Sequence, residues 1–311
     1  DNAFRKHSQH TLTDFDIHNP DWTTDFRRHD AMLFSYSFFS TIDRPLECIE
    51  KFRDFEGVKV AIFQDEYTYF LRNRQNLLNM GVDGIITCVP QPHWSDVFTG
   101  PFASIPLMEA FTGYVNERFL HHPPPLPMSE RRWKIGYRGR QVPYRYGNLT
   151  MEKFFIGLVM GKICRKRNIA CNIDVTNTSR IYGPAWSEFI RNCRTMLITE
   201  SGSNVFDFTG DRVAALERFL AANPTTSYRE AHKRFLADID DKIFMNQVSP
   251  KVFETIAFGT GLIGFEGKYS GVIEPYKHFI PLKKDYSNVD EVLALVEDTD
   301  FLEDMRQRAY V

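Results

Sequence analysis

Short apolar runs alternate with helical stretches along the first 120 residues. The runs "AMLFSY" (31–36), "VKVAIF" (58–63) and "GIITCV" (84–89) have the length and composition of strands buried on both faces of a parallel sheet. Residues 46–55 and 67–80, between these runs, have helical spacing. This alternation predicts a doubly wound α/β domain over residues 1–122.

The same alternation restarts after a proline-rich segment, residues 123–132, which we interpret as a semi-rigid linker. The pattern predicts strands at 133–138, 169–175, 195–199, 261–266 and 278–282, and helices at 151–168, 185–194, 250–258 and 289–298. A helical insertion is expected near 211–245. We therefore expect a second Rossmann-like domain over residues 133–311, with ligands bound in a cleft beyond the carboxyl ends of the strands.

Composition indicates a soluble globular protein, because 43% of the 311 residues are hydrophobic and 25% are charged. The net charge of -2 provides no broad basic field, so no nucleic-acid partner is expected. Five cysteines without a CxxC pair favour reduced thiols and a cytoplasmic location. We find no membrane-spanning run or signal peptide, and we expect both ends to have been trimmed from a longer protein.

The segment "SPKVFETIAFG" predicts a helix that can bind an anion. Ser249 suits the N-cap, Pro250 the first helical position and Gly259 the C-terminal stop. The first turn offers free N–H groups beside Lys251, and Glu254 lies one turn deeper on the same face. Glu254 is thus placed to accept hydrogen bonds from the two hydroxyls of a ribose, or else it pairs with a lysine or reaches solvent.

Residues 249–298 resemble the C-terminal domain of GT-B glycosyltransferases, in particular the bacterial family-four-like enzymes ("glycosyl transferases group 1") of surface glycan synthesis. The resemblance lies in a helix with Glu, a small residue, Ala and Gly, then an apolar strand and "DYSNVDEVL", and it extends over most of residues 131–311. It implies metal-independent transfer of a hexose-like sugar from a nucleotide-sugar donor to a glycan or lipid-linked acceptor, without a further cofactor. It leaves open a peripheral association with the inner face of a membrane.

One position departs from the pattern of the retaining enzymes that this segment resembles. Many of those enzymes have a first Glu eight residues before a second, ribose-binding Glu. Glu254 corresponds to the second, and Asn246 stands at the position of the first. The sequence therefore leaves the choice between a retaining and an inverting reaction open.

Two further segments gain a role from this resemblance. It implies that Arg138 and Arg140, near the end of strand 133–138, and Lys153 bind the donor diphosphate, whose leaving charge fixed cations stabilise. It also implies that Glu200, Ser201 and Asn204, in "ITESGSNVFDFTG", contact the donor sugar. The alternatives are a solvated basic loop and a plain capped turn.

Two acidic segments complete the candidate chemistry. Asp65 and Glu66 follow strand 58–63 and would face the cleft, where a carboxylate can bind or deprotonate an acceptor hydroxyl. The alternative is that Asp65 caps the helix beginning near Tyr67. The Asp-x-Asp spacing in "DIDD" (238–241) lies in an amphipathic helical context, so we interpret it as a solvated face and expect no metal site.

Two other functions remain open at this point. A nucleotide-sugar epimerase of the same fold would bind the same donor but needs acids and bases crowded around the sugar. A non-catalytic domain of a larger protein would recognise a glycan or a protein partner, since fold alone does not determine function.

Overall fold

The computed structural model describes residues 2–40, 51–115, 117–119 and 123–310. Its contacts divide the chain into two compact units. The smaller contains Asp1–Phe63, Arg72–Ile86 and Ser104–Leu107, and the larger contains Gln64–Leu71, Thr87–Ala103 and Met108–Val311. The loops after the second and third strands thus belong to the larger unit, whereas the predicted boundary near residue 122 stays a prediction.

A four-stranded sheet with the order β1-β2-β3-β4 forms the core of the N-terminal part. Its strands are β1 (Ala31–Phe34), β2 (Val58–Ile62), β3 (Gly84–Thr87) and β4 (Leu107–Glu109), and β2 pairs in parallel with β1 and β3. The helices of this part are α1 (Asn2–His7), α2 (Tyr36–Ser40), α4 (Phe70–Met80) and α5 (Trp94–Val97). The first half of the helix predicted at 46–55 falls outside the described residues, and residues 51–53 of its second half are helical.

The larger unit contains a five-stranded parallel sheet with the order β6-β5-β7-β8-β9. The strands are β5 (Trp133–Arg138), β6 (Cys171–Asp174), β7 (Cys193–Ile198), β8 (Gly261–Phe265) and β9 (Ile280–Leu282). The direction of winding reverses between β5 and β7. In doubly wound sheets, ligands bind outside the carboxyl ends of the strands at this switch point.

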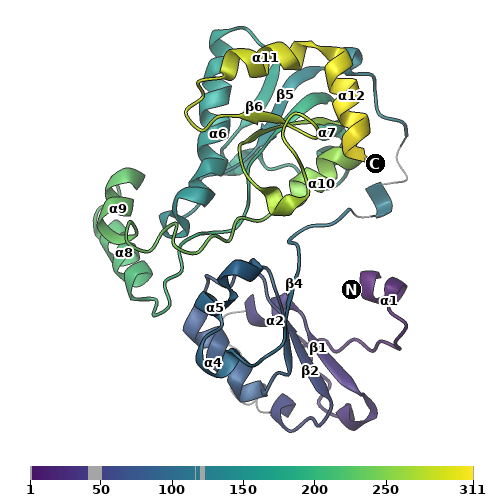
Figure 1. The fold of residues 1–311 in the computed structure, drawn as a ribbon, viewed down its shortest axis with the longest axis vertical. Helices are drawn as coiled ribbons and strands as arrows, with labels where there is room; N and C mark the ends of the chain where they lie inside the picture. Colours follow the sequence, from purple (N-terminus) through teal and green to yellow (C-terminus); the bar gives the residue numbers. More distant parts are fainter. Residues whose placement is uncertain (1, 41–50, 116, 120–122, 311) are drawn as a thin grey trace. The chain divides into compact units, whose positions relative to one another are not determined.

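Helices cover both faces of this sheet (Figure 1). Side chains of β7 alternate between two hydrophobic clusters, because successive residues of a strand point to opposite faces. Leu197 packs with α6 (Gly147–Lys166) and α11 (Val289–Glu297), whereas Met196 packs with α7 (Pro184–Arg191). Helices α10 (Pro250–Ala257) and α12 (Thr299–Tyr310) complete the cover. The prediction of two Rossmann-like α/β sheets is therefore confirmed, and the reversal of strand order that defines a doubly wound sheet is present in the five-stranded one.

The boundaries of the predicted elements are mostly confirmed to within a few residues. The largest shift is at α6, which begins at Gly147 and not at residue 151, and the later start of α4 has a local cause. Helix α4 begins at Phe70 and not near residue 67, because Asp65 and Tyr69 adopt left-handed backbone conformations with φ of 64° and 51°. Such angles interrupt a right-handed helix. Residues 64–69 consequently form a loop, and this loop carries side chains to the pocket described below.

The predicted insertion is present as α8 (Asp211–Ala222) and α9 (Tyr228–Phe235), which are joined by a small core of their own. The proline-rich segment is tied to the larger unit by the buried Arg131. Its guanidinium donates to the carbonyl oxygens of Leu126, Cys193 and Gly259. Among the helices of the described part of the chain, none is long and apolar enough to cross a membrane.

Candidate functional site

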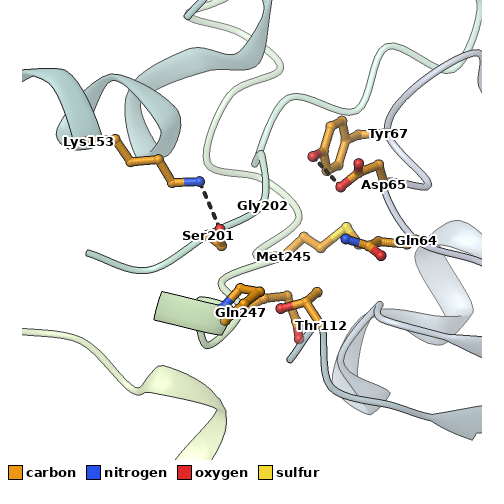
Figure 2. A pocket seen from close by; sticks show the side chains of 10 residues that line it. Gln64, Asp65, Tyr67, Thr112, Lys153, Ser201, Gly202, Met245 and Gln247 are labelled. Atoms are coloured by element: carbon orange, nitrogen blue, oxygen red, sulfur yellow. Dashed lines mark hydrogen bonds between the residues drawn. The ribbon is translucent and has the colours of Figure 1, made fainter. Parts of the chain in front are cut away.

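A pocket of about 220 Å³ opens in the larger unit. Figure 2 shows Lys153 on one side of it and Asp65 with Tyr67 on the other. The lining residues come from the loop after β2, from the segment after β4, from α6, from the loop after β7, from the segment before α10 and from the first residue of α10. They are Gln64, Asp65, Tyr67, Thr112, Lys153, Ser201, Gly202, Met245, Gln247 and Pro250.

A group of cations lies at and beside this pocket. The Nζ atom of Lys153 donates to Ser201 Oγ at 2.8 Å, and loss of water around the ammonium group lowers the pKa of Lys153 to about 8. Burial lowers the pKa of Lys251 to about 7, and the positive charge of Lys153 adds to this effect. The exposed Arg140 also lowers the pKa of Lys153, and its guanidinium makes no hydrogen bond within the described residues. An anion bound here would offset the repulsion among these cations.

The adjacent carboxylates Asp65 and Glu66 have opposite environments. Asp65 is exposed, accepts a hydrogen bond of 2.6 Å from the hydroxyl of Tyr67 and is close enough to Lys153 to stabilise its charge. Glu66 is only 5% exposed and accepts from Thr87 Oγ1 and from the backbone N–H of Cys88. Burial raises the pKa of Glu66. The pocket thus receives Asp65, while Glu66 fastens its loop to the end of β3.

The loop after β7 supplies the floor of the pocket. Ser201 and Gln247 exchange two backbone hydrogen bonds, of 2.7 and 2.9 Å. Between them Gly202 has a φ of 98°, and a Cβ atom there would lie 2.0 Å from the carbonyl oxygen of Met245. Only glycine fits both the angle and the close approach. The side chain of Gln247 in turn donates to the carbonyl oxygen of Cys88 at 2.6 Å.

Two residues predicted to contact the donor sugar hold this loop together in the structure. The buried Glu200 accepts hydrogen bonds from the backbone N–H groups of Lys268 and Tyr269 and from Nδ2 of Asn246. The buried Asn204 donates to Asn246 Oδ1 and accepts from the N–H of Met245. Their polar atoms are therefore engaged with the segment 245–247, which lines the pocket.

Arg138 packs into the protein and is not in the pocket lining. Its guanidinium donates to the carbonyl and side-chain oxygens of Asn172 and lies 4.4 Å from the ring centroid of Phe189. Burial lowers its pKa. The side chain thus joins β5 to β6. Of the other predicted cations, Lys153 lines the pocket and Arg140 is exposed, whereas Lys251 Nζ donates to the carbonyl oxygen of Arg138 at 2.8 Å.

Helix α10 confirms the predicted start and stop signals. Ser249 Oγ accepts from the N–H of Lys251, Pro250 is the first helical residue and Gly259 has a φ of 63°. Pro250 borders the pocket. Glu254 is partly exposed, and its Oε2 accepts a hydrogen bond of 2.8 Å from the indole N–H of Trp186. Within the described residues its Oε1 atom accepts no hydrogen bond.

The interpretation of residues 238–241 as a solvated face is wrong for Asp240, which is 5% exposed. Its carboxylate accepts from the backbone N–H of Asn148, at the start of α6, and lies 2.9 Å from His232 Nε2. The local sequence pattern could not predict this role, because Asp240 caps the N-terminus of α6, which lies about 90 residues earlier in the chain. Within residues 2–40, 51–115, 117–119 and 123–310, no group of three His, Cys, Asp or Glu residues is arranged to hold a metal ion.

Several residues that line the pocket were not predicted to do so from the sequence. They are Gln64, Tyr67, Thr112, Gly202, Met245, Gln247 and Pro250, of which Pro250 was predicted only as the first residue of its helix. For Gly202, its place in a loop just after a strand was a usable signal. Gln247 and Thr112 offered no such signal, because their positions depend on contacts with distant segments, such as the 2.5 Å bond from Thr112 Oγ1 to the carbonyl oxygen of Val248.

Comparison with known proteins finds solved structures with a similar fold but no protein with a significantly similar sequence. No family model matches the chain, and no curated protein sequence is significantly similar to it. Among solved structures, an alpha-glucosyltransferase in complex with UDP and a 13-mer DNA matches with a TM-score of 0.51 and 11% identity, over 92% of this chain and 76% of that chain. An alpha-glucosyltransferase in complex with UDP-glucose and DNA containing an abasic site matches with a TM-score of 0.49 and 12% identity, over 90% of this chain and 75% of that chain.

TarM matches with a TM-score of 0.45 and 13% identity, and this chain covers half of its length. At these identities the likeness concerns the fold. The chain has the two-sheet Rossmann-like arrangement of GT-B glycosyltransferases.

Proposed function

We propose that the protein is a glycosyltransferase that moves a sugar from a nucleoside diphosphate donor to an acceptor hydroxyl. The observation that carries the proposal is the pocket itself, in which Lys153 lies opposite Asp65 at the switch point of the parallel sheet. A transferase of this kind needs cations for the leaving diphosphate and a base for the incoming hydroxyl, and this pocket contains both.

The proposed donor site is formed by α6, α10 and the loop after β5. Lys153 and Arg140 would contact the diphosphate, and the dipole of α10 would add positive potential at its N-terminus. Lys251, whose Nζ atom donates to the carbonyl oxygen of Arg138 at 2.8 Å, would add its charge from behind the pocket wall. Glu254, whose Oε2 is fixed by Trp186, would accept from the ribose hydroxyls. Ser201, beside Lys153, would contact the sugar.

In the proposed reaction the acceptor oxygen forms a bond to the anomeric carbon, and the bond from that carbon to the diphosphate oxygen breaks. Asp65 takes the proton of the acceptor hydroxyl, and the nucleoside diphosphate leaves with its charge stabilised by the lysines. Asp65 suits this role because it is exposed to the pocket, whereas Glu66 is buried and engaged with Thr87. The resemblance to GT-B enzymes supports the nucleotide-sugar donor.

The test is release of nucleoside diphosphate from a panel of UDP-, GDP-, ADP- and dTDP-sugars, with chelator present. We expect release from one donor class, and Asp65→Asn should lower turnover by about 100-fold or more without changing nucleotide affinity. Lys153→Met should weaken nucleotide binding about tenfold, since a charge-assisted contact is lost. Lys162→Met, on the exposed side of the same helix, is the matched control and should change neither.

Three outcomes would contradict the proposal. Interconversion of the free donor without release would identify an epimerase. Absence of binding and turnover across the panel would favour a non-catalytic domain. Full turnover in Asp65→Asn would remove Asp65 from the chemistry.

A further inference from the structure

A row of aromatic rings leads from the pocket to the surface. Tyr67 lines the pocket, and its ring centroid lies 6.3 Å from that of Phe206. Phe206 is 6.1 Å from Phe208, which is 4.7 Å from Phe70 in an edge-to-face pair. Phe208 is 37% exposed and Tyr69, in the same loop as Tyr67, is 48% exposed. We refer to Tyr67, Tyr69, Phe70, Phe206 and Phe208 as the aromatic row.

The aromatic row is built on two fixed loops. The loop that carries Tyr67 and Tyr69 holds two residues in left-handed conformations, Asp65 and Tyr69. Such non-glycine conformations cost on the order of 1–3 kcal/mol each, and they cluster at binding and catalytic sites. Phe208 follows Asp207, whose carboxylate accepts from the N–H groups of Gly210 and Val213. The second loop is thus held by hydrogen bonds to its own backbone.

We infer that the aromatic row is the acceptor subsite and that it binds a sugar ring of a glycan acceptor, next to the sugar whose hydroxyl reacts at Asp65. This inference rests on the proposed transferase function. Once a hydroxyl lies at Asp65, the rest of the acceptor must leave the pocket. The aromatic row starts at this point, because the Tyr67 hydroxyl bonds directly to the Asp65 carboxylate (Figure 2).

The chemistry of the row favours a sugar over an alkyl chain. A pyranose ring has apolar C–H faces and a rim of hydroxyls, so it needs aromatic faces with polar groups between them. The two loops that carry the rings also contain the phenols of Tyr67 and Tyr69 and the hydroxyls of Thr68 and Thr209. A lipid tail would be better served by aliphatic side chains, and Leu71 is the one aliphatic residue within 67–71 and 206–210 of the described chain.

Saturation-transfer difference NMR with oligosaccharides tests the inference. The probes are maltohexaose, cellohexaose, chitohexaose and mannohexaose, each with UDP or GDP present, and n-dodecyl maltoside as the alkyl probe. We expect saturation of ring protons in at least one hexasaccharide, and Phe208→Ala should weaken that binding about tenfold while leaving nucleotide affinity unchanged. Phe208→Tyr should restore it.

Phe155→Ala is the matched control, because Phe155 is 39% exposed and also makes an edge-to-face pair, with Phe154 on α6. It should leave hexasaccharide binding unchanged. Saturation confined to the dodecyl protons would overturn the inference in favour of a lipid. Nucleotide binding without any hexasaccharide signal would overturn the subsite alone, whereas saccharide binding that depends on Phe208 without any nucleotide binding would overturn the donor half of the proposed function.

Discussion

Helices α6 and α10 each contribute a lysine to the cations around the pocket, but their N-termini are satisfied differently. The start of α6 is closed by the protein's own carboxylate, because Asn148 N donates to Asp240 Oδ2 at 2.8 Å. Gly147 allows this close approach, since a Cβ atom there would lie 2.5 Å from the same oxygen. The start of α10 has the hydroxyl of Ser249 at 3.4 Å from the N–H of Lys251, and it borders the pocket.

The difference shows how one structural device can serve two purposes. A helix N-terminus attracts negative charge through its free N–H groups and its dipole. Where an internal carboxylate supplies that charge, the helix end contributes to stability. Where it does not, and lysines with lowered pKa values lie beside it, the same helix end is suited to an external anion. Substitutions at the two ends should therefore separate stability from ligand binding.

The largest effect on stability is expected at the N-terminus of α6, which the carboxylate of Asp240 caps. Asp240→Ala leaves the N–H groups of Asn148 and Asp241 and the ring of His232 without their buried partner. We expect a loss of about 2–4 kcal/mol in the free energy of unfolding, with unchanged nucleotide affinity in the folded protein. Urea unfolding and calorimetric titration measure the two quantities.

Asp238→Ala, two residues away, is the control for this prediction. Asp238 pairs with Arg212 at the surface, and such pairs contribute about 1 kcal/mol or less. If Asp238→Ala destabilised the protein as much as Asp240→Ala, the cap that Asp240 forms on α6 would not be the cause of the lost stability.

At the N-terminus of α10, which no carboxylate of the described residues caps, nucleoside diphosphate binding should weaken as the pH rises above 7. Lys251 and Lys153 lose their protons with pKa values of about 7 and about 8 in the free protein, and a bound diphosphate favours their charged forms. Above these values binding requires proton uptake, so affinity should fall by up to about tenfold per pH unit for each lysine. Lys251→Met should abolish the lower inflection and Lys153→Met the upper one.

The stability of the unliganded protein should change in the opposite direction over the same range. A lysine whose pKa is lowered by folding binds more protons in the unfolded state, so each of these lysines makes stability rise with pH, from about 7 or 8 up to its unfolded value near 10.4. Urea unfolding at several pH values between about 7 and 10 measures this rise in stability.

The binding prediction is checked by calorimetric titration of nucleotide in buffers of different ionisation enthalpy, which gives the number of protons taken up on binding. Binding without proton uptake at pH 8 would show that the lysines do not contact the ligand.

What could be predicted from the sequence depended on how local the cause was. The signals of α10 are contained in eleven consecutive residues, and Ser249, Pro250 and Gly259 act as predicted. The strands of both sheets other than β4 followed from apolar runs in the same way, whereas β4 was not predicted. The exposure of Asp65 and the burial of Glu66 could not be predicted. They depend on the left-handed backbone conformation of Asp65 and on the hydrogen bond of Glu66 with Thr87, which is 21 residues further along the chain.

A smaller effect is expected for Glu254→Gln. The amide oxygen can still accept from Trp186, so packing should survive and the melting temperature should change little. Loss of the charge weakens the proposed contacts to ribose and removes an attraction that favours protonated Lys251. We expect nucleotide affinity to fall about tenfold, and the lower inflection of the pH profile to move to lower pH. A lowered melting temperature with unchanged affinity would assign Glu254 to a structural role.

The smallest effect on nucleotide affinity should come from placing a carboxylate at the N-terminus of α10, as Asp240 does at the N-terminus of α6. Ser249→Asp places a carboxylate at the open helix end beside Lys251, and we expect stabilisation of about 0.5–1 kcal/mol from the dipole and the nearby charge. The same carboxylate should compete with a bound diphosphate and reduce its affinity severalfold. Ser249→Asn is the control, because asparagine caps as well as aspartate without the charge, so it should leave nucleotide binding unchanged. If both variants bound nucleotide as tightly as the wild type, the start of α10 would lie outside the donor site, and the difference between the two helix ends would concern stability alone.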